Sequence, residues 1–496
     1  MRLFRRFALA GLLLAGSQQL LSGQEKKPEE PKDVSYYRNI RPILQQHCQG
    51  CHQPAKAQGG FVMTGHADLL KPGDKGEPGI VPGKPDKSMI VTQVTPHDGK
   101  KAAMPKGKDP LTDYEINLIK KWITQGAKDD TPASAHQITI DMDHPPVYQL
   151  PPVINAVAFS PDGQLLAVTG YHEVLLHKPD GSGIIARLVG LSERTQSLAF
   201  SPDGKWLAVT GGDPARFGEV QIWEVAKRKL SLSLSVTYDT IYGASWSPDG
   251  TKVAFGCADN TLRAIDAKTG QQVLFQGAHG DWVLDTAFSG DGNYLISVSR
   301  DMSMKMTHVE TQRFIDNITS ITPGALKGGL QTVTIRPRLD PKRMSKVPPD
   351  TPDAKPQPYD EVLIGGSDGQ PKIYKIHREA KRVIGDDFNK VTEFETLPGR
   401  IFAGRFSPDG KRIVVGSSAD GKGDVRVYQV EGNKLISKFE GQKGPVYALA
   451  YRPDGKVVAS AGFDGVVRLN DPNTGKLIKE FLPVPLTKAV AAGTGR

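Results

Sequence analysis

The sequence predicts a multidomain protein, in which a small all-α domain precedes an all-β propeller of seven blades. Three observations lead to this prediction. Two segments near the N-terminus, residues 36–47 and 112–126, repeat apolar side chains at helical spacing. From residue 153 onward, a Pro-Asp-Gly turn between apolar strands recurs roughly every 41 to 47 residues. The 53 glycines and 37 prolines among the 496 residues favour many turns over long helices.

Residues 1–23 predict an export signal. An apolar run at 7–16 is too short to span a bilayer, and it follows three positive charges, Arg2, Arg5 and Arg6. A charged, Pro-containing linker follows at 24–34, and no later apolar run is long enough to span a membrane. We therefore expect an exported, periplasmic or extracellular protein with no integral membrane segment in the mature chain.

The most informative motif is Cys48-Gln49-Gly50-Cys51-His52. A C-x-x-C pair followed directly by His is typical of covalent attachment of c-type haem. Each thiol can bond one vinyl group on the same porphyrin edge, and the adjacent His can ligate the iron. The motif therefore predicts one covalent haem c, with Cys48 and Cys51 forming thioethers and His52 as the proximal iron ligand.

Two other interpretations of this motif are a redox-active thiol pair and half of a zinc site. A redox pair has no need of the following His. A zinc site would need two further ligands, and the remaining cysteine, Cys257, lies far along the chain. In a strand-like apolar segment, Cys257 is expected to be buried and inert.

A second helix is predicted directly after residue 111. Thr112 and Glu115 form a capping box, Gly126 is a C-cap candidate, and one face is apolar, with Ile116, Ile119, Trp122 and Ile123. Met104 lies on the loop before this helix. A thioether opposite His is the usual ligand pair for electron transfer, so Met104 is the predicted distal iron ligand. The rivals are Met63, Met89 and His97, whereas His47 and His66 are expected to be bystanders.

Residues 35–130 resemble a known family. The similar positions are Ile40-Arg41-Pro42-Ile43-Leu44, the Cys48–His52 motif, Gly59-Gly60, Pro82-Gly83, Ser88, Met104-Pro105, and Leu111-Thr112 through Trp122-Ile123 and Gly126-Ala127. They look like the planctomycete-type cytochrome c domain. The resemblance implies a small, class I-like, mono-haem domain with His52 and Met104 as axial ligands, found in secreted multidomain bacterial proteins.

After a polar linker at 131–152, residues 153–485 contain the repeats, and 486–496 are expected to be a disordered tail. Alternating apolar residues on both sides of the turns predict β-hairpins. The turns contain Pro161-Asp162-Gly163, Pro202-Asp203-Gly204, Pro248-Asp249-Gly250, Asp291-Gly292, Pro408-Asp409-Gly410 and Pro453-Asp454-Gly455. Residues 292–400 have room for one more unit, which gives seven. The ring is closed either by an outer strand at 477–482 or by a segment near Ile138.

The repeats resemble WD repeats of a divergent kind. Trp223 lies at the position of the Trp-Asp signature, and Asp301 lies in the turn between the second and third strands of its unit, like Asp259, Asp368 and Asp464. His279 and Asp301 are expected to hydrogen-bond within one repeat as structural support. A Pro-rich insertion at 339–359 interrupts the fifth unit and is either an exposed mobile loop or a docking element.

We therefore expect a mono-haem electron carrier whose propeller is a protein-docking scaffold. Its expected partners are redox proteins and the haem-attachment machinery.

The formal net charge of +9 is mild for this length and does not indicate nucleic-acid binding. The alternatives are a redox enzyme with a substrate or second-cofactor site in the propeller channel, and a haem-based sensor. Scattered histidines without metal-ligand spacing, and the absence of a nucleophile motif or phosphate loop, favour the carrier.

Overall fold

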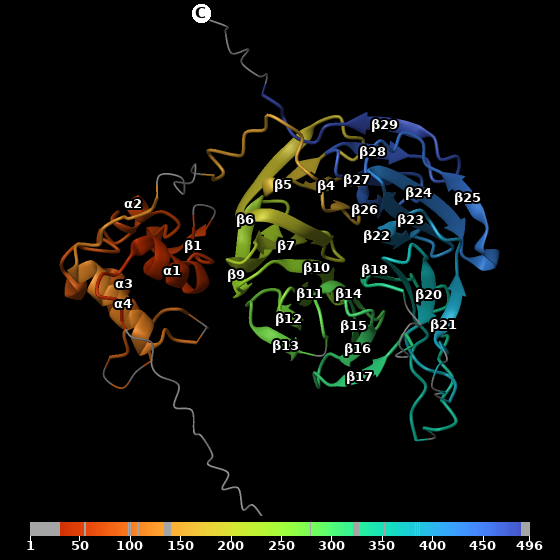
Figure 1. Cartoon of the computed structure of the whole chain (residues 1–496), viewed down its shortest axis with the longest axis horizontal. Helices are drawn as coiled ribbons and strands as arrows, with labels where there is room; N and C mark the ends of the chain where they lie inside the picture. The colour runs from red at the N-terminus through yellow and green to blue at the C-terminus, as the bar shows by residue number, and fades with distance from the viewer. Residues whose placement is uncertain are drawn as a thin grey trace, which may run out of the picture.

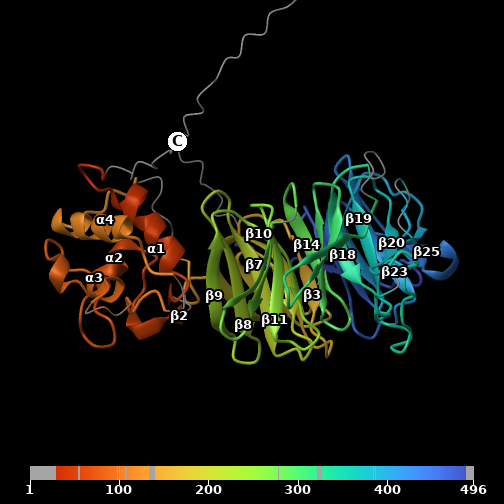
Figure 2. The same ribbon diagram turned by 90° about the horizontal axis from the view of Figure 1, so that it is seen from below.

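The computed structural model describes residues 30–53, 56–97, 99, 101–106, 109–132, 140–277, 279–320, 327–351, 353–381, 383, 385 and 387–487. The predicted export signal lies outside these residues. A helical N-terminal part lies beside a larger all-β part (Figures 1 and 2). No helix in the described residues is long and apolar enough to cross a membrane.

The helical part is built from short elements. They are the π-helix η1 (Tyr36–Ile40), α1 (Arg41–His47), β1 (His52–Gln53), β2 (Lys56–Ala57), η2 (Gln58–Gly60), α2 (His66–Leu69), η3 (Pro85–Lys87), α3 (Met89–Val94) and α4 (Asp113–Thr124). The expected helix over 36–47 is formed by η1 and α1 together. The side chain of Ser35 caps it by accepting a hydrogen bond from the N–H of Arg38.

Helix α4 forms as its sequence predicts. Thr112 and Glu115 make both hydrogen bonds of a capping box, and Gly126 follows the helix with a φ of 95°, a conformation that glycine adopts without strain. The apolar face of α4 packs into one core with η1 and α1, where the rings of Trp122 and Tyr36 stack at 5.5 Å between centroids. This core fixes α1, and therefore the turn that follows it.

The described all-β part contains one seven-stranded and five four-stranded sheets, all antiparallel and connected in sequence order. The seven-stranded sheet contains β3 (Val157–Phe159), β4 (Leu166–Thr169), β5 (Tyr171–His177), β6 (Ile184–Phe200), β7 (Trp206–Asp213), β8 (Phe217–Glu224) and β9 (Lys229–Thr237). β6 is 17 residues long, and its first half pairs with β5 whereas its second half pairs with β7. It therefore joins two neighbouring four-stranded units.

The next three sheets follow in order along the chain. Their strands are β10 (Ile241–Trp246), β11 (Lys252–Cys257), β12 (Leu262–Asp266) and β13 (Gln272–Gln276); β14 (Val283–Phe288), β15 (Tyr294–Ser299), β16 (Met304–His308) and β17 (Phe314–Asn317); and β18 (Leu330–Ile335), β19 (Glu361–Gly366), β20 (Lys372–Lys375) and β21 (Lys390–Glu393). The first strand of each sheet packs against the first strand of the next, which arranges the sheets around a central axis (Figure 1).

The last two sheets complete this arrangement. Their strands are β22 (Arg400–Phe406), β23 (Arg412–Ala419), β24 (Lys422–Gln429) and β25 (Leu435–Lys438), then β26 (Val446–Tyr451), β27 (Val458–Gly462), β28 (Val467–Asn470) and β29 (Leu477–Phe481), with the short helix η5 (Glu431–Asn433) before β25. β29 is the outer strand of the last sheet, as the first alternative for ring closure predicts. The ring closes by packing, because one apolar core joins β3 and β4 to β26, β27 and β28.

The linker and the C-terminal segment lie together. Tyr148 forms a parallel bridge with Leu486, and the N–H of Thr487 donates to the carbonyl of Tyr148 at 2.9 Å. Tyr148 is itself buried. The tail was expected to be disordered from residue 486, but these two residues are held by the linker. Residues 488–496 lie outside the described part.

The insertion at 339–359 lies between β18 and β19, where the sequence places it. It is folded back on itself by hydrogen bonds from the N–H of Ser345 to the carbonyl of Gln357 and from the N–H of Tyr359 to the carbonyl of Arg343. The guanidinium of Arg343 lies 3.5 Å from the centre of the Tyr359 ring. β20 and β21 of the same sheet lie on the side of the ring away from the helical part (Figure 1).

Candidate functional site

The C-x-x-C-H motif forms one tight turn at the end of α1. The N–H of Cys48 donates to the carbonyl of Leu44 and so continues the helix by one residue. The N–H groups of Cys51 and His52 both donate to the carbonyl of Cys48, each at 3.1 Å. Neither Cys48 nor Cys51 is in a disulfide bond in the described structure, and both are partly exposed. The turn therefore presents two thiols and an imidazole within five consecutive residues.

His52 lies in an environment that suits a metal ligand. The residue is only 9% exposed, and its Nδ1 is buried without a hydrogen-bond partner. Burial lowers the pKa of the imidazole, which favours the neutral form that ligates metals. The ring of Phe61 lies edge-on, with 6.4 Å between the two ring centroids.

Met104 lies on the loop between α3 and α4. Its backbone N–H donates to the carbonyl of Gln93 at 2.9 Å, which fixes the loop to the end of α3. The side chains of Met104, Cys48 and Phe61 are partly buried against the same apolar core. Two thiols on one turn outside any disulfide, a buried imidazole with an unsatisfied nitrogen, and an apolar surface that also contacts a methionine fit a c-type haem. Cys48, Cys51, His52 and Met104 are the residues that would hold it.

The rival ligands and the bystanders have other surroundings. Met63 is buried in the core, and its backbone bonds to His52 and Gln49, while Met89 begins α3. His97 is exposed. The Nε2 of His47 lies 3.2 Å from a carboxylate oxygen of Glu115, and the Nε2 of His66 lies 2.7 Å from the carbonyl oxygen of Ala127.

Residues of the all-β part also approach the motif, and no sequence pattern predicted them. The hydroxyl of Ser235 donates to the carbonyl of Gln45 at 3.3 Å, and the hydroxyl of Tyr238 donates to the side chain of Gln46 at 2.8 Å. These partners are 190 and 192 residues apart in the chain. Because Ser235 follows an ordinary strand pattern, only the fold could show that it faces α1.

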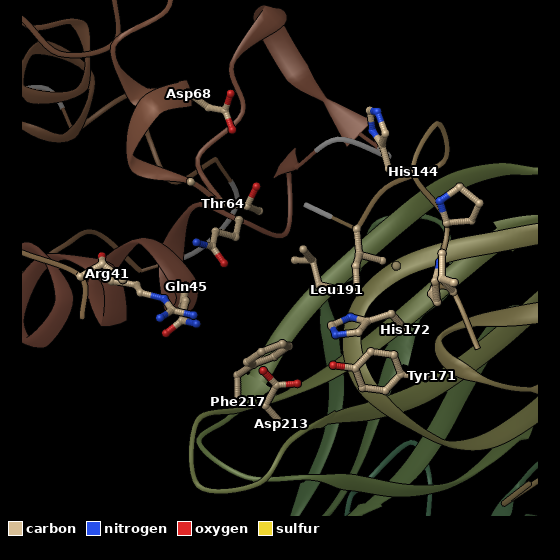
Figure 3. Close-up of a pocket in the computed structure, with 18 of the residues that line it drawn as sticks. Arg41, Gln45, Thr64, Asp68, His144, Tyr171, His172, Leu191, Asp213 and Phe217 are labelled. Carbon is tan, nitrogen blue, oxygen red and sulfur yellow. The ribbon is translucent and has the colours of Figure 1, made fainter. Parts of the chain in front are cut away.

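A cavity of about 980 Å³ lies beside this contact, between the two parts of the chain (Figure 3). Arg41 and Gln45 line it from α1, and His172, Asp213 and Phe217 line it from the all-β part. Burial raises the pKa of Asp213 and lowers that of His172, because it disfavours the charged form of each side chain.

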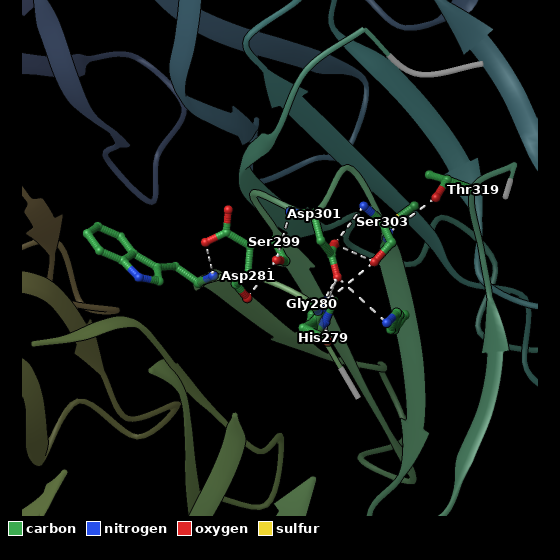
Figure 4. A network of polar contacts seen from close by, with 11 residues as sticks. His279, Gly280, Asp281, Ser299, Asp301, Ser303 and Thr319 are labelled. Atoms are coloured by element: carbon green, nitrogen blue, oxygen red, sulfur yellow. Dashed lines mark hydrogen bonds and ion pairs between the residues drawn. The ribbon is translucent and has the colours of Figure 1, made fainter. Parts of the chain in front are cut away.

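The expected contact between His279 and Asp301 is present (Figure 4). The Nδ1 of His279 lies 3.0 Å from Asp301, and its Nε2 lies 2.7 Å from the hydroxyl of Ser297. Burial alone would raise the pKa of Asp301, but hydrogen bonds from His279 and Ser303 outweigh it and hold that pKa well below its usual range. The contacts are internal to one sheet, which supports the structural role. Among the described residues, no three His, Cys, Asp or Glu side chains are grouped to hold a metal ion.

Two family models match the chain. The model described as Planctomycete cytochrome C matches residues 48–107, which contain the C-x-x-C-H turn and Met104. The model described as WD domain, G-beta repeat matches residues 145–174, 192–214, 229–266, 270–307 and 433–471. A small helical domain with a haem-type motif is thus joined to an all-β repeat domain. The chain thus joins a segment that matches the planctomycete cytochrome c model to segments that match the WD repeat model.

Curated relatives are similar over part of the chain. Serine-threonine kinase receptor-associated protein of Gallus gallus is 22% identical over 248 residues, which are 48% of this chain and 68% of the relative. Eukaryotic translation initiation factor 3 subunit I of Drosophila pseudoobscura pseudoobscura is 22% identical over 246 residues, 49% of this chain and 55% of the relative. WD repeat-containing protein 91 homolog of Dictyostelium discoideum is 33% identical over 84 residues, 17% of this chain and 11% of the relative.

Proposed function

We propose that this chain is an exported mono-haem c-type cytochrome that transfers electrons, with a seven-bladed propeller as its protein-docking scaffold. The observation that carries the proposal is the turn after α1. It holds Cys48, Cys51 and His52 together, and Cys48 packs against the same apolar core as Met104. The bound haem would supply a one-electron redox centre.

The roles of the residues follow from this arrangement. Cys48 and Cys51 would anchor the porphyrin edge to a turn that the core of α1 and α4 holds in place. His52 and Met104 would supply the side-chain ligands of the iron. With two protein side chains as iron ligands, the site would favour electron transfer over binding of small ligands, which is why we propose a carrier and not a sensor.

A count of seven blades is supported by the sheets. Five four-stranded sheets make five blades, and the seven-stranded sheet makes two, because β6 serves as the outer strand of one and the inner strand of the next. Such a ring offers a rigid surface to other proteins. Export is supported by the predicted signal at residues 1–23. It is also supported by the C-x-x-C-H motif, since covalent haem attachment is expected outside the cytoplasm. The expected partners are redox proteins.

The test is to express the full chain with a c-type haem-attachment system and to compare wild type with Met104→Ala and Met63→Leu. We expect the wild type to gain the mass of one haem and to show a low-spin spectrum with the long-wavelength band of Met–iron ligation. Met104→Ala should lose this band because the thioether is gone. Met63→Leu, which preserves volume at the buried rival, should retain it.

Three results would contradict the proposal. Wild type without covalent haem would show that the turn is not an attachment site. A Met–iron band that survives in Met104→Ala but disappears in Met63→Leu would assign the distal position to Met63. Rapid binding of carbon monoxide by the reduced wild type would favour the haem-based sensor over the electron carrier.

A further inference from the structure

The outer edge of the second blade-like unit lies directly against the haem-attachment turn. β9 is the last strand of its sheet, so one of its edges has no neighbouring strand in the described part of the chain. At this edge, a Cβ atom added to Gly50 would lie 2.5 Å from the carbonyl oxygen of Ser233 and 3.9 Å from the Cα of Leu234. Gly50 therefore permits a close backbone approach that no other residue allows without movement.

Two hydrogen bonds support the contact on the N-terminal side of Gly50. Gln45 and Gln46 accept them from Ser235 in β9 and from Tyr238 directly after this strand. The hydroxyl of Ser233 points the other way and donates to the fully buried carboxyl of Glu219. This bond turns the side chain of Ser233 into its own sheet.

Gly50 stands between Cys48 and Cys51, so any group bonded to the two thiols is held at this same turn. We propose that β9 covers the thioether edge of the haem, and that the propeller is thus a wall of the haem site as well as a scaffold. The unpaired edge of β9 and the haem edge bonded to the two cysteines would then shield each other from solvent. This inference rests on the haem attachment proposed above.

The interface between β9 and the turn is only partly packed. The cavity of about 980 Å³ next to the turn separates Arg41 and Gln45 from His172 and Phe217 (Figure 3). The hydrogen bonds from Ser235 and Tyr238 and the close approach of Ser233 all lie near residues 45–50. A small change at Gly50 should therefore open the interface and let solvent and small reagents reach the haem edge.

The test compares wild type with Gly50→Ala and the matched control Gly277→Ala in the full-length holoprotein. Neither glycine has a left-handed φ, and a Cβ at Gly277 meets no atom within 4 Å, so only Gly50→Ala introduces a clash. We expect Gly50→Ala to keep its covalent haem. It should show severalfold faster haem reduction by ascorbate and faster amide hydrogen exchange in residues 229–237. Gly277→Ala should match wild type in both measurements.

A second variant keeps the proposal testable if Gly50→Ala fails to attach haem. Tyr238→Ala lies outside the motif, removes the hydrogen bond to Gln46, and should change both readouts in the same direction by less. If holoprotein forms but Gly50→Ala and Tyr238→Ala both behave as wild type, β9 does not cover the haem edge. If wild type itself contains no covalent haem, the proposed function fails instead, and the mass spectrum separates the two outcomes.

Discussion

At the scale of single residues, the three cysteines of the sequence lie in two different environments. Cys48 and Cys51 are partly exposed on the turn after α1. Cys257 is completely buried in β11, and burial raises the pKa of its thiol to about 12. Because the thiolate is the reactive form, Cys257 is inert in the folded protein. Its sequence context predicted this, since a cysteine between strand residues is usually a small apolar side chain.

This difference gives a prediction for thiol titration. Native holoprotein should react with no equivalent of Ellman's reagent, because two sulfurs are bonded to haem and the third is buried. Unfolded holoprotein should react with one equivalent, from Cys257. Chain without haem should expose the thiols of Cys48 and Cys51 when native. A native holoprotein that reacts at two thiols would show that the haem is not covalently bound.

At the scale of elements, the hairpin turns have a common chemistry that the sequence predicted. In the turn between β10 and β11, the hydroxyl of Ser247 donates to Asp249 at 2.5 Å and accepts from the N–H of Lys252. Burial alone would raise the pKa of Asp249, but hydrogen bonds from Ser247 and Thr251 outweigh it and lower the pKa to about 2. The same Ser–Asp bond occurs at Ser160, Ser201, Ser289 and Ser407.

The lowered pKa predicts how stability depends on pH. Ionised Asp249 contributes stability above its unfolded pKa of about 3.8, and this contribution disappears as the pH falls towards about 2. Ser247→Ala should therefore cost about 1 kcal/mol of unfolding free energy at pH 7. The cost should shrink between pH 4 and pH 2. Urea unfolding at several pH values measures it, and a cost independent of pH would show that Asp249 is not stabilised by Ser247.

Some elements could not be predicted because no local signal distinguishes them. The hairpins have Pro-Asp-Gly turns between apolar strands, so they are visible in the sequence. β6 runs through Gly190 and Ser192 without a break, although it serves two units. The length of β6 is decided by its pairing with β5 and β7 and not by the local strand propensity of its residues. The strands β18 to β24 form in a region that the WD repeat model does not match.

At the scale of the whole molecule, the linker is fastened to the ring by a buried ion pair. The hydroxyl of Tyr148 donates to Glu173 at 2.7 Å. Arg187 donates to the same carboxylate and to the carbonyl of Pro146. The side chain of Glu173 is 0% exposed, so its charge depends on these partners. Residues 146–148 of the linker are therefore held against the all-β part at this ion pair. The helical part contacts the all-β part separately, at β9.

Removing one partner of this ion pair should be costly. Arg187→Ala should lower the free energy of unfolding by about 3 kcal/mol, because it leaves Glu173 buried without its cation. Lys205→Ala, which removes an exposed partner of Asp203, should have little effect. Thermal or urea unfolding followed by far-UV circular dichroism compares them. Equal, small losses in both variants would mean that the linker contact contributes little.

The sequence by itself determined the two kinds of domain, the haem-type motif and the chemistry of the turns. These features depend on short-range spacing: two thiols and an imidazole in five residues, apolar side chains at a helical or alternating period, and glycine at a turn. It also predicted Met104, whose packing on the same core as Cys48 supports that prediction.

Only the tertiary structure decided what lies opposite the motif. The approach of Ser233 to Gly50, the hydrogen bonds from Ser235 and Tyr238, and the closure of the ring by packing all join residues far apart in the chain. Such contacts depend on the sum of many strand pairings and on the path of the linker. No local pattern encodes them, because an edge strand that covers a haem domain has the same alternation as one that faces water.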